Sequence, residues 1–194
     1  MDEAKVKNIK TQILSDNWYT LNNISFDYRL RSGEWVKQSR ESYDRGNGAT
    51  ILLLNKQNRS VILIRQFRMP TYVNGNSSGL MIETCAGLLD GNDPVTCIIK
   101  ETEEETGYRI KNVKKVFELY MSPGAVTEII HFFIAEYDEK MKVSEGGGLK
   151  SEHEDIDILE IDFNEALNMI RSGEIKDAKS IILLQYAQIN NLLH

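Results

Sequence analysis

The sequence has little of what marks several large classes of protein. Its two cysteines, Cys85 and Cys97, form no CxxC pair, which excludes a disulfide framework and argues against a zinc site. No apolar run approaches the roughly 18 residues that a membrane-spanning helix needs, and the N-terminus "MDEAKVKNIK" lacks the apolar segment of a signal peptide. We therefore predict a soluble cytoplasmic protein in which both cysteines are reduced residues of the core.

Positive charge is also scarce. The chain has 23 Lys and Arg against 29 Asp and Glu, which gives a net charge of −6. A broad nucleic-acid-binding surface is not expected, because neutralising a phosphate backbone requires clustered basic residues. An acidic protein can still bind an anionic ligand when a divalent metal supplies the positive charge.

Proline is rare as well, with three in 194 residues, and no linker rich in Gly, Ser or Pro divides the chain. This length suits one domain of ordinary size, or a domain with an extension. The apolar patterns predict a small sheet over 17–44, the turn "RGNG" at 45–48, and two buried strands in "ATILLLN" and "SVILIRQF". They also predict a loop over 70–79, strands over 80–87, 113–121, 128–137 and 156–162, and helices over 94–106, 163–173 and 177–193. Asn164 and Asp177 are the predicted N-caps of the last two helices, and the fold class is α+β or an α/β sandwich.

The most acidic segment with a regular apolar spacing is "DPVTCIIKETEEETGYRI". Asp93 and Pro94 are typical of a helix start, and Gly107 is typical of a helix end. We therefore predict a helix over 94–106 whose apolar face includes Val95, Ile98, Ile99 and Thr102.

Three carboxylates share one side of this helix. Glu101, Glu104 and Glu105 stand at i, i+3 and i+4, whereas Glu103 is about 200° away from Glu101 and points elsewhere. Like charges near the C-terminal end of a helix are unfavourable for the helix itself. They suit a hard divalent cation such as Mg²⁺ or Mn²⁺, and the alternative is a solvated acidic face.

The window from Gly87 to Tyr108 resembles the signature of the Nudix hydrolases, G-x5-E-x7-R-E-U-x-E-E-x-G-U, in which U is a bulky apolar residue. The tail "KETEEETGY" matches "REUxEExGU", with Lys100 for Arg and Thr102 for the bulky residue. Asp93 stands where the first Glu belongs, and the spacing from there to Lys100 is one residue short of the pattern.

The resemblance extends along nearly the whole chain to the bacterial GDP-mannose pyrophosphatases, which are related to the ADP-ribose pyrophosphatases. The stretches that carry it include "ILSDNWYTL", "VILIRQFR", "CAGLLD", "FELYMSPG" and "TEIIHFFIAEY". The resemblance implies an α/β/α sandwich of residues 46–194, preceded by an N-terminal β domain of residues 1–45 that is exchanged in a homodimer. It also implies Mg²⁺-dependent hydrolysis of GDP-mannose, with Mn²⁺ as a possible substitute. ADP-ribose or a broader set of nucleoside-diphosphate sugars is the alternative substrate, and a non-catalytic nucleotide-sugar sensor is the alternative function.

By the same resemblance, the metal ligands are the carbonyl of Ala86 and the carboxylates of Glu101, Glu105 and Glu154. Glu104 would bind metal or take a proton from water. The loop "SEHEDID" supplies the last carboxylate as ligand or general base, and Glu152 and Asp155 are the alternatives to Glu154.

The resemblance also implies a set of substrate contacts. Trp18 is expected to stack on guanine from the partner subunit, and Arg68 is expected to meet phosphate. Glu128 and Lys179 match positions that contact sugar or phosphate, and His153 adjoins the metal loop. The other expected contacts are Ser39, Arg40, Glu41, Ala86, Gly87, Leu88, Glu105 and Glu154.

Overall fold

A computed structural model describes residues 4–193, apart from the side chain of Glu152. The chain forms two compact units. The first consists of the residues up to Asn47 together with Tyr120–Ile129, and the second of Gly48–Leu119 and the residues from Ile130 onward.

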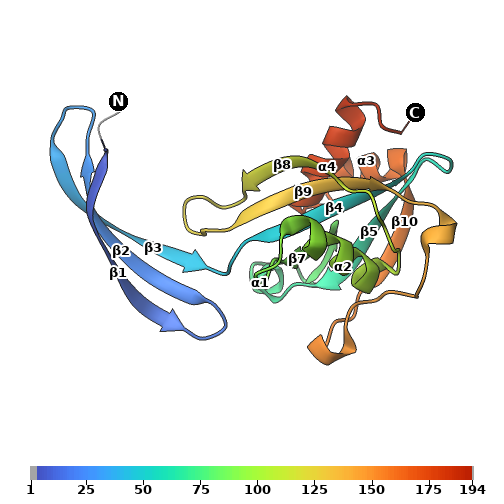
Figure 1. Cartoon of the computed structure of the whole chain (residues 1–194), viewed down its shortest axis with the longest axis horizontal. Helices are drawn as coiled ribbons and strands as arrows, with labels where there is room; N and C mark the ends of the chain where they lie inside the picture. Colours follow the sequence, from blue (N-terminus) through green and yellow to red (C-terminus); the bar gives the residue numbers. More distant parts are fainter. Residues whose placement is uncertain (1–3, 194) are drawn as a thin grey trace. The chain divides into compact units, whose positions relative to one another are not determined.

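The first unit is an antiparallel sheet of three long strands in the order β1-β2-β3, drawn in blue in Figure 1. Its strands are β1 (Val6–Asp16), β2 (Thr20–Arg29) and β3 (Trp35–Asp44). The prediction over 17–44 therefore found two strands and missed β1, whose polar sequence "VKNIKTQILSD" alternates poorly. At the end of β3, Tyr43 forms a bridge with Val126 of the returning segment.

The second unit is built on a seven-stranded sheet. The order along its main path is β10-β5-β4-β9-β8, with β6 paired to β5 and β7 paired to β4. Its strands are β4 (Gly48–Asn55), β5 (Ser60–Phe67), β6 (Leu80–Glu83), β7 (Cys85–Leu88), β8 (Lys114–Tyr120), β9 (Ile129–Glu136) and β10 (Asp157–Asp162). Strands β4 and β9 are parallel, and all eight residues of β4 are buried. Burial on both faces requires a covering layer on each side.

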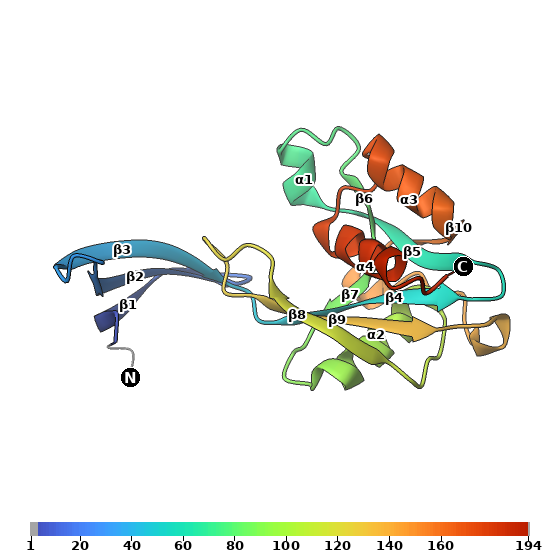
Figure 2. The same cartoon turned by 90° about the horizontal axis from the view of Figure 1, so that it is seen from above.

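Helices supply those two layers, as Figure 2 shows. Helix α2 (Pro94–Thr106) packs on one face, where its Cys97 and Ile98 join Ile51 and Leu53 in one core cluster. Helices α3 (Phe163–Ser172) and α4 (Ala178–Ile189) cover the other face, with Leu183 and Leu184 fully buried. The second unit is thus an α/β/α sandwich.

Most predicted elements are confirmed, including the helix over 94–106. Besides the missed strand β1, four details are wrong. The segment expected as a loop contains a short helix, α1 (Met69–Val73). The strand expected over 80–87 is two strands, because the chain leaves β5 after Glu83 and joins β4 from Cys85. Helix α3 is capped by the carboxylate of Asp162 and not by Asn164. Val95, placed on the apolar face of the acidic helix, is 42% exposed.

Cys85 and Cys97 are both free and buried, as predicted. Among the described residues, every helix is too short or too polar to cross a bilayer.

Candidate metal and pyrophosphate site

Helix α2 begins and ends for identifiable reasons. The Asp93 carboxylate accepts hydrogen bonds from the N–H groups of Val95 and Thr96, at 3.0 and 3.1 Å, so this residue is an N-cap. Gly107 ends the helix at φ +78°, where an added Cβ would collide with the carbonyl of Ser144. Asp93, which stands at the first Glu of the signature, therefore has a structural role in this chain.

Glu105 is the buried member of the acidic group. Its side chain lies under β7, where one carboxylate oxygen accepts a hydrogen bond of 3.1 Å from the N–H of Ala86. Burial raises the pKa of the Glu105 carboxyl to about 8, and the charges of Glu101 and Glu154 add to the rise. Hydrogen bonds from Cys85 and from the Ala86 N–H oppose it. The carboxylates of Glu101 and Glu105, on α2, and of Glu154, on a later loop, are therefore close enough for electrostatic repulsion.

Gly87 provides the room for Glu101. An added Cβ at Gly87 would overlap the carboxylate group of Glu101, so no other residue type fits here without moving that side chain. The backbone of β7 and the first carboxylate of the acidic group are therefore in direct contact.

The other two glutamates of the helix have separate partners. Glu104 forms an ion pair of 3.2 Å with Lys100, one turn earlier. Glu103 forms two hydrogen bonds with Arg109, at 2.8 and 2.7 Å, on another side of the helix. The predicted separation of Glu103 from the other three is confirmed.

A glycine-rich loop covers the C-terminal end of α2. The N–H groups of Gly147 and Gly148 donate to the carbonyls of Glu105 and Glu104, at 2.9 and 3.1 Å. These bonds satisfy carbonyls that would otherwise add negative potential beside the carboxylates. We did not predict from the sequence that these glycines cap α2.

The same loop carries the last predicted carboxylates. Glu154 accepts a hydrogen bond of 2.8 Å from the N–H of Leu149, and its charge acts on Glu105. Asp155 is exposed, and the side chain of Glu152 lies outside the described residues. His153 is also exposed and ends a short 3-10 turn at φ +57°. Of the three alternatives, Glu154 is the one with a described interaction toward α2.

The donors present fit a hard divalent cation. They are carboxylate oxygens, and their mutual repulsion is the condition that a bound cation relieves. Within the described part of the chain, no three Asp, Glu, His or Cys side chains by themselves form a group that could hold a metal ion. A cation here would complete its shell with the Ala86 carbonyl, water and phosphate oxygens, which is the usual behaviour of Mg²⁺.

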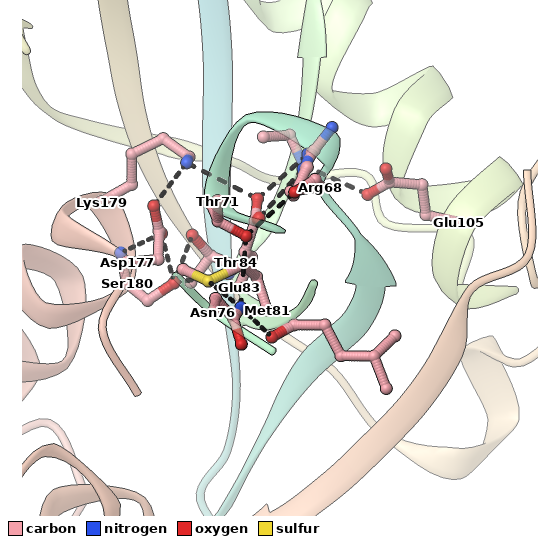
Figure 3. Close-up of polar contacts among 12 residues, drawn as sticks. Arg68, Thr71, Asn76, Met81, Glu83, Thr84, Glu105, Asp177, Lys179 and Ser180 are labelled. Atoms are coloured by element: carbon pink, nitrogen blue, oxygen red, sulfur yellow. Dashed lines mark hydrogen bonds and ion pairs between the residues drawn. The ribbon is translucent and has the colours of Figure 1, made fainter. Parts of the chain in front are cut away.

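One cation, Arg68, lies near Glu105, and a second, Lys179, lies on the other side of Glu83, as Figure 3 shows. Arg68 directly follows β5, and its guanidinium forms an ion pair with the carboxylate of Glu83. Lys179 lies in the first turn of α4, and its ammonium forms an ion pair with Asp177. Burial by itself would lower the pKa of Arg68, but hydrogen bonds and charge from Glu83 and the charge of Glu105 raise it. Positive and negative groups therefore meet at one end of the sheet.

Comparison with known proteins decides the family. Residues 44–182 match the model of the NUDIX domain. The chain belongs to the Nudix hydrolase family. Residues 5–43 match a second model, described as the GDP-mannose pyrophosphatase NudK N-terminal domain. The match covers both parts of the chain.

Named relatives of this Nudix hydrolase are similar over almost their whole length. A GDP-mannose pyrophosphatase of Shigella flexneri is 58% identical over 185 residues, which is 95% of this chain and 96% of the relative. The GDP-mannose pyrophosphatase of Escherichia coli O157:H7 is 57% identical over the same share of both chains.

The remaining predicted contacts of this Nudix hydrolase belong to the first unit. Trp18 is 86% exposed and stacks on Tyr19, with 5.8 Å between ring centroids, so it is no core residue. Ser39 is hydrogen-bonded to Asn23 on the neighbouring strand. Arg40 donates to the carbonyl of Ser39 and to Gln38, Glu41 is exposed, and Glu128 lies 3.5 Å from Arg45.

Sequence reasoning missed Glu83. This carboxylate ends β6 within the otherwise apolar stretch "LMIETCAGLL", and it is 3% exposed. A single acidic residue in an apolar strand was the available signal, because a buried carboxylate needs a cationic partner.

Proposed function

We propose that this chain hydrolyses the pyrophosphate bond of GDP-mannose in the presence of Mg²⁺. The observation that carries the proposal is the 58% identity, over 95% of the chain, to a relative named GDP-mannose pyrophosphatase. The buried carboxylate of Glu105, held against β7 beside Glu101, supports it because a pyrophosphatase needs such a site for a divalent cation.

The reaction adds one water to the substrate. The water oxygen bonds to one phosphorus, the bridging P–O bond breaks, and the products are GMP and mannose 1-phosphate. When bound, Mg²⁺ (or Mn²⁺) would neutralise phosphate oxygens and acidify water. The carbonyl of Ala86 and the carboxylates of Glu101, Glu105 and Glu154 would hold it. Glu104 forms an ion pair of 3.2 Å with Lys100, and its carboxylate would accept the proton of the attacking water.

The proposed substrate contacts include residues of each unit. Arg68 and Lys179 would bind phosphate oxygens, and the backbone of Ala86, Gly87 and Leu88 would lie along the substrate. Trp18 of a second copy would stack on the guanine, because an exposed indole offers the flat apolar face that a base needs. The further proposed contacts are Ser39, Arg40, Glu41, Glu128, His153 and Glu154.

We also propose that residues 1–45 form a β domain that is exchanged between two copies, while residues 46–194 form the hydrolase domain. In the first unit no described residue is buried, although Ile9 and Ile13 are large and apolar. A second copy would cover this apolar surface. Light scattering should therefore give twice the mass of the 22.2 kDa chain, and a monomer would contradict the exchange.

The function is tested with a panel of substrates. The protein is incubated with Mg²⁺ and, separately, GDP-mannose, ADP-ribose, NADH and other nucleotide sugars, and the products are separated by chromatography. Release of GMP and mannose 1-phosphate, lost on addition of EDTA, is expected. Preferred cleavage of ADP-ribose would change the substrate. Binding of GDP-mannose without any product would instead identify a sensor.

A further inference from the structure

Glu83 is a buried carboxylate, which destabilises the fold unless a cation is paired with it. It is the last residue of β6, three residues before Ala86, and its side chain is only 4% exposed. Burying an unpaired carboxylate is strongly unfavourable, so the fold has to supply cations. It supplies two, and both are proposed substrate contacts.

The first cation is held in a fixed orientation. Nε of Arg68 donates to one oxygen of Glu83 and an Nη of the same guanidinium donates to the other, each at 3.0 Å. This bidentate geometry fixes the plane of the guanidinium. Two of its five N–H groups are used in this way, and the other three have no partner among the described residues. The side chain is 40% exposed, so these groups are accessible to a ligand.

The second cation is tied to the same carboxylate. Nζ of Lys179 lies 3.6 Å from Glu83 and 2.7 Å from Asp177. Asp177 is also the N-cap of α4, since its other oxygen accepts from the backbone N–H and the hydroxyl of Ser180. That hydroxyl accepts from the N–H of Thr84, the residue after Glu83, at 2.7 Å. The start of α4 and the end of β6 are therefore locked together, and Figure 3 shows Glu83 between Arg68 and Lys179.

We propose that Glu83 is a positioning residue that fixes Arg68 and Lys179 as a pair of cations for the phosphate oxygens of a nucleoside diphosphate bound beside Ala86 and Glu105. The proposal rests on the proposed function. Without Glu83, two adjacent cations would repel each other and their long side chains would gain rotamer freedom. Both effects would lower the affinity of Arg68 and Lys179 for phosphate and would leave the acidic helix unchanged.

The main test is a double-mutant cycle on the best substrate of the panel. Glu83→Gln is nearly isosteric but has no charge and can accept only one of the two hydrogen bonds. We expect kcat/KM to fall about 10- to 100-fold, mainly through KM, which is the range found for residues that orient the ligands of a metal ion. In an Arg68→Ala background the same change should cost less, about threefold at most, because only Lys179 is then left for Glu83 to position. Glu83→Asp, which keeps the charge, should recover part of the loss.

The matched control is Asp157→Asn. Asp157 also accepts two hydrogen bonds from one guanidinium, that of Arg65 in β5, at 3.0 and 2.7 Å, although both go to the same carboxylate oxygen. This pair joins β5 to β10 and not to β6. This variant should keep kcat/KM within twofold. A readout without substrate is the nitrogen NMR signal of the Arg68 side chain, whose Nε–H should exchange slowly in the wild type and quickly in Glu83→Gln.

The outcomes separate the two proposals. The positioning role is overturned if Glu83→Gln lowers kcat/KM by the same factor with and without Arg68→Ala, or if the Arg68 NMR signal is unchanged in Glu83→Gln. Neither result would contradict the proposed hydrolase activity. If the wild type hydrolyses no member of the panel, the proposed function fails first, and the substrate role of Glu83 fails with it.

Discussion

The two units of this chain show opposite ways of using strands. In the first unit no described residue is buried, and β1 and β3 are mostly exposed along ten or eleven residues. In the second unit β4 is buried at all eight positions, between α2 on one face and α3 and α4 on the other. Among the described residues, a buried hydrophobic core is found in the second unit and not in the first.

The difference bears on where chemistry can be placed. A packed sandwich holds backbone and side chains to fractions of an ångström, which a buried carboxylate and a metal site require. An open three-stranded sheet gives long edges and exposed apolar side chains, such as Ile13 and Trp18, which suit contact with a partner or a ligand. We therefore expect variants of the second unit to affect chemistry, phosphate binding and folding, and variants of the first to affect association and binding of the base.

The largest effect is expected at Glu105. Glu105→Gln should lower kcat by at least about 1000-fold, because it removes a ligand charge at nearly constant volume. The control is Glu103→Gln, on another side of the same helix, which loses only its pair with Arg109 and should stay within about threefold. Steady-state kinetics at saturating Mg²⁺ measures both, with circular dichroism to show that α2 persists. An active Glu105→Gln enzyme would remove Glu105 from the site.

The second prediction compares a substitution at a buried core residue with one at an exposed residue. Leu53→Ala, at a position 1% exposed, should lower the free energy of unfolding by about 2–5 kcal/mol at every protein concentration. Ile13→Lys, at a position 59% exposed, should instead dissociate the proposed dimer and make the melting temperature independent of concentration. Gln12→Lys on the same strand is the control. Equal behaviour of Ile13→Lys and Gln12→Lys in light scattering would mean that this face has no partner.

The smallest effect is a pH dependence of the metal-free protein. The pKa of Glu105 is about 8 in the folded state against an ordinary value of 4.5, so the folded state binds the extra proton between these values. Its contribution to stability is therefore complete below about pH 4.5 and is lost as pH rises toward 8, by up to about 1.4 kcal/mol per unit. In EDTA the melting temperature should fall between pH 6 and 8, and Glu105→Gln should flatten that slope. Added Mg²⁺ should raise the melting temperature more at pH 8 than at pH 6. A slope unchanged by Glu105→Gln would contradict the shifted pKa.

Local signals predicted much of this structure. Asp93, Pro94 and Gly107 gave both ends of α2, and the continuous apolar runs gave β4 and β5, because caps and hydrophobic periodicity act within a few residues. The polar strand β1 was missed, since its pairing with β2 compensates for a weak pattern of its own.

The sequence by itself determined the family, the acidic helix and the separation of Glu103 from its neighbours, since these depend on spacing along one chain segment. Tertiary structure alone decided that Glu105 is buried beneath Ala86, that Gly147 and Gly148 cap α2, and that Glu83 joins Arg68 to Lys179. The physical reason is that burial and ion pairing depend on which distant segments meet. Residues 68, 83, 105 and 179 come from four segments, and only the folded sheet brings their charges within reach of one another.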